Sequence, residues 1–489
     1  MKLSDLPALI GCSAGGLPDT AVSGVTEDSR RAVAGSIFVA APGVRSDGHD
    51  YVAKAIELGA VAIIGSRPGL DALCGVPYLY TASPRKALGL LAHALRGNPS
   101  QRMIVIGVTG TNGKSSSVVM IHRVLESCGF PTAALGTLGY RIGHQTLPAP
   151  HTTPFGEDLA EMFGKADEAG CSYVVMEASS HAIDQDRIAG IDFNVAAFTN
   201  LTQDHFDYHT DMDSYRRAKI KLFEQIRGAG RFTVVNVDDP SAGSFISASH
   251  VPCHTYGTGG EVRAEDIDIR LDGTRFTART PWGAASVEMH LLGRHNVQNA
   301  LCVIAVCCAL GLPLDMVAGG VGTVKSVPGR FERIETGRGF EVAVDYAHTD
   351  DGLRNVLEAA REVCPARVIV VFGCGGDRDR TKRPKMGAVA GALSDFAIVT
   401  SDNPRTEEAN SIIAAIVPGV EGAGKKEGVD YCVMPDRRQA IAKAVEMARP
   451  GDLVMIAGKG HEDYQILGTV KIHFDDREEA RAALARLPE

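Results

Sequence analysis

Short apolar runs recur along the chain at lengths typical of buried strands, and segments with helical spacing separate them. In the first hundred residues the pattern predicts a strand over 35–40, a helix over 51–59 and a strand over 60–64. Further buried strands are predicted over 103–108, 173–176, 195–199, 367–372, 396–400 and 453–457. After the strand at 103–108, one helical face contains Val118, Ile121, Leu125 and Cys128. This alternation of strands and amphipathic helices predicts an α/β fold with parallel sheets.

The length of the chain, 489 residues, exceeds what one hydrophobic core usually supports, so we expect two to four domains. The segment 98–101 (Asn-Pro-Ser-Gln) has the composition of a linker. A second candidate boundary is the segment 327–334, which begins Val-Pro-Gly-Arg.

Composition and charge narrow the class of protein. Hydrophobic residues make up 45% and charged residues 22%, as in soluble enzymes, and no apolar run approaches the roughly 18 residues of a membrane span. The first residues lack the features of a signal peptide, so we expect a cytoplasmic protein. A net charge of -9 argues against a nucleic-acid groove. Eleven cysteines without C-x-x-C pairs are expected to be thiols rather than a disulfide or zinc framework.

The most informative stretch is 107–116, Gly-Val-Thr-Gly-Thr-Asn-Gly-Lys-Ser-Ser, which follows a predicted strand and begins a helix. Its glycines allow successive backbone N–H groups to point at one anion, Lys114 adds a charge for the β- and γ-phosphates, and Ser115 can hold Mg²⁺. The strict phosphate-loop pattern has glycine six residues before the lysine, where this chain has Val108. We predict a variant phosphate cradle for ATP or GTP; a glycine-rich turn without nucleotide is the alternative.

Polar segments directly follow several predicted strands. They are 177–181, 200–205, 373–378, 401–405 and 458–462. Because ligands of open α/β sheets bind beyond the carboxyl ends of the strands, we expect the chemistry in these segments. Glu177 is a candidate metal ligand, since a carboxylate directly after an apolar strand is costly without a partner. His205 is a weaker candidate, because Mg²⁺ prefers oxygen and a hydrogen-bonded core imidazole is the alternative.

A set of short motifs along the chain, taken together and in order, resembles the motifs of the Mur ligases of bacterial cell-wall synthesis. Within that family it resembles the enzymes that add the third amino acid to the peptide of the UDP-muramoyl precursor. The ordered set spans nearly the whole chain, which makes it far more specific than any single motif. The matching motifs are Asp28–Arg30, Asp47–His49, the cradle, Thr152–Pro154, Glu177–His181, Asp204–His205, Ala218–Lys219, Asn296–Asn299, Pro328–Arg330, Asp345–His348, Gly375–Arg378, Asp402–Arg405 and Gly458–Glu462.

The resemblance implies an ATP-dependent amide ligase with three domains. These are a small α/β UDP-binding domain over 1–100, a central P-loop ATPase domain with a parallel sheet over 101–330, and a Rossmann-like amino-acid-binding domain over 331–489. The implied substrates are ATP, UDP-N-acetylmuramoyl-L-Ala-D-Glu and meso-diaminopimelate, with Mg²⁺ as cofactor. The D-glutamyl carboxylate would attack the γ-phosphate of ATP, and the amine of diaminopimelate would then attack the acyl phosphate. We expect a monomer with no nucleic-acid partner and no membrane span.

Carried over residue by residue, the resemblance assigns catalytic roles to Lys114, Glu177, His205 and Lys219. Mg²⁺ would be bound by Ser115, Glu177, His205 and carbamylated Lys219 (N6-carboxylysine). Without the resemblance, Lys219 would be interpreted as a solvated lysine on a helix. The nucleotide contacts would come from Gly110, Thr111, Asn112, Gly113, Lys114, Ser115, Ser116, Asn296, Asn299, Arg330, Asp345 and His348. The UDP-muramoyl-dipeptide would be held by Ser29, Thr152, Thr153, Ser179, Gln185 and Arg187, for which turn and capping chemistry is the alternative.

Diaminopimelate would be bound by Arg378, Asp402, Asn403, Arg405, Gly458 and Glu462. The segment 402–405 (Asp-Asn-Pro-Arg) resembles the signature of diaminopimelate-adding relatives, whereas lysine-adding relatives lack the arginine. The Arg405 guanidinium can bind the second carboxylate through two charge-assisted hydrogen bonds worth about 1.5–3 kcal/mol. Lysine would leave Arg405 unpaired, so we expect roughly tenfold to a few hundredfold discrimination from this contact. A surface arginine after an Asn-Pro turn is the alternative.

Several alternatives stay open at this stage. They are a lysine-adding ligase, another Mur ligase or a folylpolyglutamate synthetase that shares the cradle, and a catalytically inactive nucleotide-binding regulator. Three positions depart from the family pattern: His151, His295 and Asp350. They concern the glycan-peptide and adenine pockets rather than the residues with assigned catalytic roles.

Overall fold

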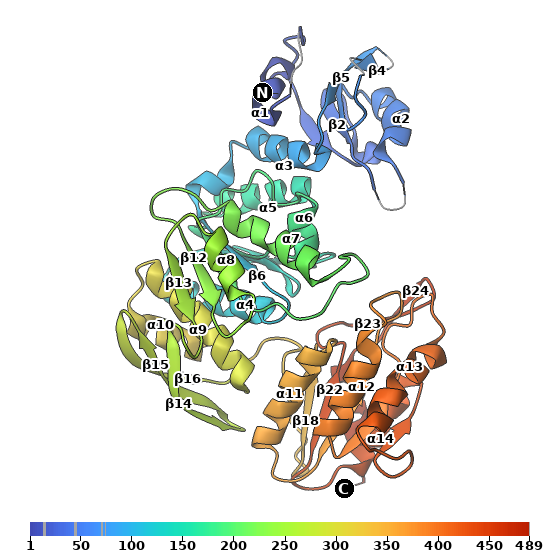
Figure 1. The fold of residues 1–489 in the computed structure, drawn as a ribbon. Coiled ribbons are helices and arrows are strands. Elements are labelled where there is room, and N and C mark those ends of the chain that lie inside the picture. The colour runs from blue at the N-terminus through green and yellow to red at the C-terminus, as the bar shows by residue number, and fades with distance from the viewer. Residues whose placement is uncertain (13–15, 44–45, 70–71, 74, 489) are drawn as a thin grey trace.

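The computed structural model describes residues 1–12, 16–43, 46–69, 72–73 and 75–488. Figure 1 shows three α/β domains that follow one another in chain order, from the N-terminal domain (blue) through the central domain to the C-terminal domain (orange to red). No helix among the described residues is long and apolar enough to cross a membrane. The ten cysteines that the structure describes are free thiols, which agrees with the prediction for them.

The N-terminal domain is built on a small sheet whose strands follow the order β1-β2-β3-β5-β4. Along β2, Ile37 and Val39 pack with α3, whereas Phe38 and Ala40 pack with α2, because successive side chains of a strand point to opposite faces. The elements are α1 (Leu6–Ile10), β1 (Gly24–Thr26), β2 (Ser36–Ala40), α2 (Val52–Glu57), β3 (Ala62–Gly65), β4 (Ala72–Leu73), β5 (Val76–Tyr80) and α3 (Pro84–Leu95).

The central domain is built on a larger sheet with the strand order β13-β12-β11-β6-β10-β7-β8-β9. Its strands pair in parallel from β13 to β7, and β8 and β9 add antiparallel pairs at one edge. The strands are β6 (Ile104–Thr109), β7 (Thr132–Gly136), β8 (Gly139–Ile142), β9 (Gln145–Leu147), β10 (Tyr173–Glu177), β11 (Val195–Phe198), β12 (Phe232–Asn236) and β13 (Cys253–Tyr256). Its helices are α4 (Lys114–Ser127), α5 (Gly156–Glu168), α6 (Ser180–Asp184), α7 (Met212–Glu224), α8 (Ala242–Ala248), α9 (Arg294–Ala309) and α10 (Leu314–Gly322).

Helices cover both faces of this sheet, which explains the continuous apolar runs in its strands. Val118, Ile121 and Leu125 of α4 pack into the core with α9 and α10 on one face, as their helical spacing predicts. The cluster on the other face includes residues of α5, α6, α7 and α8.

The prediction of strands and helices alternating across the whole central region was incomplete. An antiparallel sheet with the order β14-β15-β16 stands between β13 and α9; it comprises β14 (Arg263–Arg270), β15 (Gly273–Thr280) and β16 (Gly283–Met289). Along β15 and β16 buried and exposed positions alternate, as with Phe276 and Ala278 in β15, because one face packs on the core and the other faces solvent. A search for continuous apolar runs misses such strands.

The C-terminal domain has the strand order β17-β18-β22-β19-β20-β21, in which the β17 pair is antiparallel and the others are parallel. Helices α11, α12 and α13 pack on one face of the sheet, and α14 and α15 pack on the other. The strands are β17 (Glu332–Ile334), β18 (Glu341–Asp345), β19 (Val368–Phe372), β20 (Phe396–Val399), β21 (Tyr431–Val433), β22 (Leu453–Ala457) and the separate hairpin β23 (Tyr464–Leu467) and β24 (Val470–His473). The helices are α11 (Asp350–Val363), α12 (Lys382–Leu393), α13 (Ala409–Gly422), α14 (Arg437–Met447) and α15 (Asp476–Arg486).

A buried ion pair connects α14, α15 and the end of β22. Arg437 and Asp476 are both 0% exposed, and Nε and Nη2 of the guanidinium donate to the two carboxylate oxygens at 2.8 and 2.6 Å. Arg437 Nη2 also donates to the carbonyl oxygen of Ala457, the last residue of β22, at 3.0 Å. The pair therefore anchors the strand end that precedes the polar segment 458–462.

Replacement of Asp476 by alanine should destabilise the protein by about 3–5 kcal/mol, because it leaves the guanidinium of Arg437 buried and unpaired. The matched control is Asp213→Ala in α7, which removes an exposed ion pair with Arg216 (2.8 Å) and should change stability by less than about 1 kcal/mol. Urea-induced unfolding of both variants beside the parent protein measures the difference. Equal losses in the two variants would contradict the anchoring role.

Candidate active site

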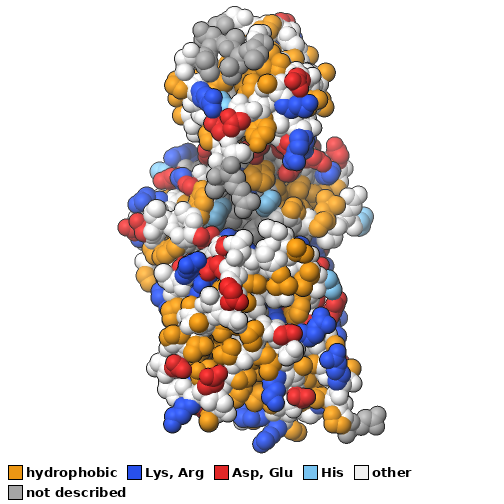
Figure 2. All heavy atoms as spheres, turned by 90° about the vertical axis from the view of Figure 1, so that its right-hand side faces the viewer, with side chains coloured by type: hydrophobic (Ala, Val, Ile, Leu, Met, Phe, Trp, Pro, Cys, Tyr) orange, Lys and Arg blue, Asp and Glu red, His pale blue; other side chains and the backbone are white. Residues whose placement is uncertain are grey.

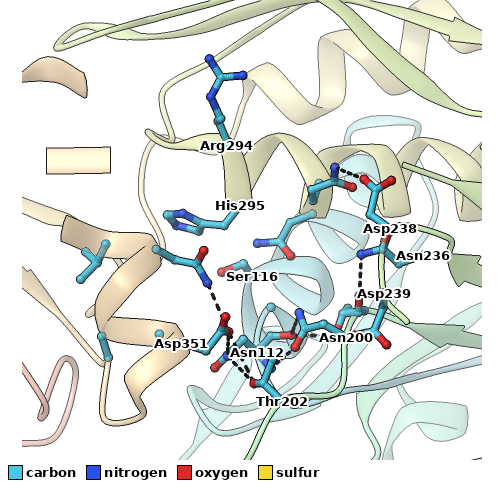
Figure 3. A pocket seen from close by; sticks show the side chains of 18 of the residues that line it. Asn112, Ser116, Asn200, Thr202, Asn236, Asp238, Asp239, Arg294, His295 and Asp351 are labelled. Carbon is cyan, nitrogen blue, oxygen red and sulfur yellow. Dashed lines mark hydrogen bonds between the residues drawn. The ribbon is translucent and has the colours of Figure 1, made fainter. Parts of the chain in front are cut away.

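A pocket of about 430 Å³ lies between the central and C-terminal domains (Figure 3). Its walls come from the loop after β6, the segments that follow β11 and β12, the first turns of α9, the segment after β18 and the first turns of α11. Its volume lies in the range of small-molecule sites. Of the predicted nucleotide contacts, the residues that line it are Asn112, Gly113, Ser116, Asn299, Arg330 and Asp345.

The loop after β6 has the tight conformation that its glycines predict. Gly110 and Gly113 have φ values of 147° and 84°, which side chains rarely adopt. A Cβ at Gly113 would also collide with the amide of Asn299 in α9. Lys114 folds back over the loop, so that its Nζ donates to the carbonyl oxygens of Gly110 and Thr111, each at 2.9 Å. The lysine is thus held at the loop by neutral oxygens, next to the place predicted for phosphates.

A hydrogen bond to Asp351 connects this loop to the C-terminal domain. The carboxylate of Asp351, in the first turn of α11, accepts from Asn112 Nδ2 at 2.7 Å and from Asn355 Nδ2 at 3.3 Å. Asn112 and Asp351 are 239 positions apart, so no local pattern could indicate the contact. Lining residues outside the predicted nucleotide contacts include Thr202, Asn236, Asp238, Asp239, Arg294 and Gln298.

Arg330 also reaches across this boundary. Its Nη2 lies 3.4 Å from Ser115 Oγ, and its guanidinium carbon lies 4.8 Å from the centre of the Tyr346 ring. Asp345 organises the same turn, since its two carboxylate oxygens accept from the backbone N–H groups of Phe331 (2.7 Å) and Ala347 (2.8 Å). Together they place a cation beside the first turn of α4.

Two of the predicted metal ligands, Ser115 and Glu177, line one small cavity beside the pocket. Glu177 is buried at the end of β10, and its Oε1 accepts from the backbone N–H of Thr137 at 2.8 Å. Within the described residues, no group of three or more His, Cys, Asp and Glu side chains could hold a metal ion. This donor set of one carboxylate and one hydroxyl suits Mg²⁺, which keeps several waters and binds substrate phosphates.

Lys219 of α7 is buried beneath the phosphate loop rather than exposed to solvent. Its Nζ donates to the carbonyl oxygen of Gly110 at 2.7 Å and lies 4.6 Å from the centre of the Tyr215 ring. Burial and the neighbouring charge of Lys114 lower the pKa of Lys219 well below its ordinary value, which favours the free amine. The interpretation as a solvated helix lysine was therefore wrong.

His205 lies in a cluster of ionisable side chains at the domain boundary. Its Nε2 is 3.4 Å from Asp204 Oδ2, and Nε2 of His348 is 3.7 Å from the same oxygen. Lys382 Nζ approaches Asp204 Oδ1 at 3.9 Å from α12. Burial lowers the pKa of His205 to about 3, although the charge of Asp204 acts to raise it. The imidazole is therefore neutral, and one of its ring nitrogens can accept a hydrogen bond. The ring of His181 lies 4.8 Å from that of His205.

A second and larger cleft, of about 820 Å³, begins at this cluster. It is lined by segments of both the central and the C-terminal domains, and Tyr346 lines both it and the first pocket. Figure 2 shows the surface hollowed midway along the molecule, with histidine side chains (pale blue) at the edge of the hollow.

The central-domain wall of the cleft contains Thr152, Thr153, Ser179 and Arg187. Thr153 Oγ1 donates to the carbonyl oxygen of Glu177 (2.7 Å) and accepts from the backbone N–H of Ser179 (3.1 Å). Arg187 is oriented by Gln185, whose Oε1 accepts from the guanidinium at 2.7 and 3.0 Å. Ser179 caps α6, as the turn-and-capping alternative allows, but it still faces the cleft.

The C-terminal wall contains all six residues predicted for diaminopimelate: Arg378, Asp402, Asn403, Arg405, Gly458 and Glu462. Arg405 has a φ of 53° and donates from Nη1 to the carbonyl oxygen of Gly376 at 2.7 Å. Its backbone pairs with the hairpin at Ile466, 3.1 Å from nitrogen to oxygen. Asn403 Nδ2 donates to Glu462 Oε2 at 3.0 Å. Arg405 is thus held in the wall of the cleft rather than exposed on the surface.

Several predicted site residues are not among the lining residues of the cavity assigned to their ligand; Gly110, Thr111 and Lys114 lie in the phosphate loop but do not line the first pocket. Asn296 does not appear among the lining residues; its Nδ2 donates to the carbonyl oxygen of Leu292 at 2.8 Å and its Oδ1 accepts from Asn299 at 3.1 Å. His348 lines the larger cleft rather than the pocket assigned to the nucleotide. Gln185 orients Arg187 instead of facing the cleft. Ser29 is not among the lining residues of either cavity; it lies in the short helix Ser29–Arg31 of the N-terminal domain, the domain predicted to bind UDP.

Three family profiles match the chain. They are described as the Mur ligase family catalytic domain (residues 21–96), the Mur ligase middle domain (108–307) and the Mur ligase glutamate ligase domain (329–460). A protein of Geobacter metallireducens named UDP-N-acetylmuramoyl-L-alanyl-D-glutamate--2,6-diaminopimelate ligase is 45% identical over 100% of this chain and 99% of its own. A protein of Gloeobacter violaceus with the same name is 44% identical over 99% of this chain and 98% of its own.

Solved structures agree with these matches. A structure with that same ligase name is 31% identical and superposes with a TM-score of 0.70, covering 99% of both chains. MurF of Acinetobacter baumannii shares the fold at 22% identity, with a TM-score of 0.67 over 93% of this chain and 95% of its own. The family profiles together with the full-length relatives show that the chain belongs to the Mur ligase family of ATP-dependent ligases.

Proposed function

We propose that this protein joins meso-diaminopimelate to UDP-N-acetylmuramoyl-L-Ala-D-Glu in cytoplasmic peptidoglycan precursor synthesis, through an acyl-phosphate intermediate formed with ATP. The observation that supports this most directly is the larger cleft, in which the residues predicted for the two reactants line facing domains. The nucleotide pocket adjoins it at Tyr346. The names of relatives at 44–45% identity over nearly the whole chain support the same reaction.

Activation by ATP meets a chemical requirement. At neutral pH a carboxylate and an ammonium group form a salt, so the carboxylate must first become an acyl phosphate. In the proposed mechanism Lys114 and Arg330 neutralise charge on the nucleotide, where cations held away from water are most effective. Both lie at the phosphate loop, Lys114 on its carbonyl oxygens and Arg330 beside Ser115.

Mg²⁺ would be held by Ser115 and Glu177, with His205 and carbamylated Lys219 at a second position. When bound, it would neutralise phosphate oxygens and align the attacking carboxylate. The buried state of Lys219 supports carbamylation, because a free amine is the form that reacts with CO₂. Tyr215 and the carbonyl of Gly110 hold this amine in position.

We further propose that the residue roles and the domain bounds 1–100, 101–330 and 331–489 hold as the family resemblance assigns them, with two changes. Asn296 supports Asn299 rather than touching the nucleotide, since it accepts that residue's hydrogen bond. His348 belongs to the reacting centre beside Asp204. The protein is expected to act as a monomer.

The amino-acid specificity provides the first test of this function. With ATP, Mg²⁺ and UDP-N-acetylmuramoyl-L-Ala-D-Glu, the protein should release phosphate far faster with meso-diaminopimelate than with lysine. The physical reason is that lysine has no second carboxylate for Arg405. A phosphate-release assay over an amino-acid panel, with mass spectrometry of the product, gives the answer. Equal use of lysine would reject the specificity, and phosphate release that ignores the amino acid would reject the ligase reaction.

Replacement of Arg405 by methionine should raise the KM for meso-diaminopimelate by roughly tenfold to a few hundredfold, because two charge-assisted hydrogen bonds are lost. The KM for ATP should stay within about twofold, since the nucleotide site is formed by other residues. The control is Arg438→Met, which removes an exposed guanidinium from the same domain. Unchanged use of diaminopimelate by the Arg405 variant would show that this side chain does not bind the second carboxylate.

Replacement of Lys219 by alanine should nearly abolish turnover, and a short exogenous carboxylate such as acetate should restore part of it by standing in for the carbamate. The control is Lys221→Ala on the same helix, whose side chain is half exposed and pairs with Asp184 at 2.7 Å. Initial rates with and without acetate measure the effect. Activity like that of the parent in Lys219→Ala would remove the carbamate from the mechanism.

A further inference from the structure

Lys459 is a fully buried cation behind the wall of the larger cleft. Its Nζ lies 3.3 Å from Asn403 Oδ1, 3.4 Å from Glu462 Oε2 and 3.9 Å from Asp402 Oδ1. The side chain is 0% exposed, and its Nζ lies 5.4 Å from the centre of the Tyr464 ring. Its three oxygen partners are among the described residues that line the cleft, whereas Lys459 is not. The lysine therefore acts on the cleft through these partners.

The charges of Asp402, Glu462 and Lys459 do not balance one another. Asp402 and Glu462 provide two negative charges and Lys459 one positive charge, so one negative charge remains. An ammonium group in the cleft would balance it. Burial and the charge of Asp402 raise the pKa of Glu462, and Lys459 acts to lower it. Like charges on neighbouring carboxylates disfavour ionisation of one of the pair, so the cation behind them favours the ionised form of Glu462.

The other charged groups near this cluster have partners of their own. Arg437 also interacts with Asp402 and Glu462 through its charge, but its two hydrogen bonds to Asp476 pair that charge. His348 also acts on Glu462, but its Nε2 is already directed toward Asp204 at 3.7 Å. The cations of the cleft wall are directed elsewhere: Arg405 donates to the carbonyl oxygen of Gly376, Arg378 pairs with Asp207 at 3.4 Å, and Lys471 Nζ lies 3.7 Å from the centre of the Tyr464 ring. The neighbouring Tyr464 and Tyr346 are neutral near pH 7, because burial raises their pKa values.

Lys459 also sets the positions of its partners. Asn403 Oδ1 accepts from Lys459 and from the backbone N–H of Ile466 (2.9 Å), while Nδ2 of the same amide donates to Glu462. The amide is thereby fixed with its oxygen toward the lysine. Gly458 directly precedes Lys459. A Cβ at Gly458 would lie 2.6 Å from Asp402 Oδ2, so the loop can approach this carboxylate only because this position has no side chain.

We infer that Lys459 is a positioning residue for amino-acid recognition, which holds Asp402, Asn403 and Glu462 so that the two carboxylates present one unbalanced negative charge to an ammonium group of the incoming diamino acid. This inference rests on the proposed function and identifies a determinant of its amino-acid site that does not itself touch the substrate. Lys459 lies in the segment 458–462, which follows the strand end that Arg437 and Asp476 anchor.

The test is Lys459→Met, which removes the charge but keeps an apolar side chain of similar length. The KM for meso-diaminopimelate should rise by about tenfold or more at pH 8, because the cation that keeps both carboxylates ionised is lost. It should rise further as the pH falls to about 6, since protonation of Glu462 removes the attraction for the ammonium group. The KM values for ATP and for UDP-N-acetylmuramoyl-L-Ala-D-Glu should stay within about twofold.

Two further variants separate this role from a merely structural one. In Lys459→Met combined with Glu462→Gln, the added pH dependence of KM should disappear, because the titrating carboxylate is gone. Urea-induced unfolding should show that the second change restores part of any stability lost in the first. If Lys459→Met does not fold, Lys459→Gln enters the same assays, because it keeps a donor for Asn403 without the charge. Lys443→Met, an exposed change on α14, is the matched control.

The outcomes distinguish this inference from the proposed function. If the parent protein does not use diaminopimelate, the proposed function is wrong. If the parent uses it but the single variant keeps the parent's KM and pH profile, the inference alone is overturned. A proportional rise of all three KM values without a change in pH profile would also overturn it, because that result indicates general distortion.

Discussion

The active centre depends on holding positive charge away from water at the boundary of two domains. Lys459 is fully buried, and Lys114 and Arg330 lie at the phosphate loop. A buried charge is costly unless oxygen atoms lie close to it. The loop carbonyls accept hydrogen bonds from Lys114, whereas carboxylate and amide oxygens lie around Lys459. These cations therefore also specify how the surrounding loops pack.

Glycine permits these loops to approach one another. At Gly113 a side chain would strike Asn299 of α9, and at Gly110 it would strike Thr199 at the end of β11. Both positions also have backbone angles that favour glycine. The same requirement recurs in the C-terminal domain, where Gly458 lies against Asp402. Close packing of loops at the carboxyl ends of the strands thus makes room for ligands at the sheet edges and supplies backbone groups to bind them.

The two sheets work as one site because polar side chains join their edges. Asn112 donates to Asp351, and Gln203 Nε2 donates to Asp379 Oδ2 at 2.8 Å and to Thr381 Oγ1 at 2.6 Å. Polar contacts of this kind can be replaced by hydrogen bonds to water, which would allow the domains to move relative to each other during turnover. The buried Arg437–Asp476 pair, in contrast, lies within one domain, where it anchors the end of β22 before the segment 458–462.

The sequence alone determined the α/β class, the buried strands, the phosphate loop and the polar segments that follow the strands, because each depends on local periodicity or on residue types at short spacing. It also indicated the residues around Arg405, which all come to one wall of the cleft. It missed the antiparallel sheet β14–β16, whose alternating strands bury one face only. Only the tertiary structure decided that Asp351 meets the phosphate loop, that His348 turns to Asp204, and that Lys219 and Lys459 are buried. These properties arise from contacts between distant segments, and burial and countercharge depend on what the fold packs around a side chain rather than on its neighbours in the chain.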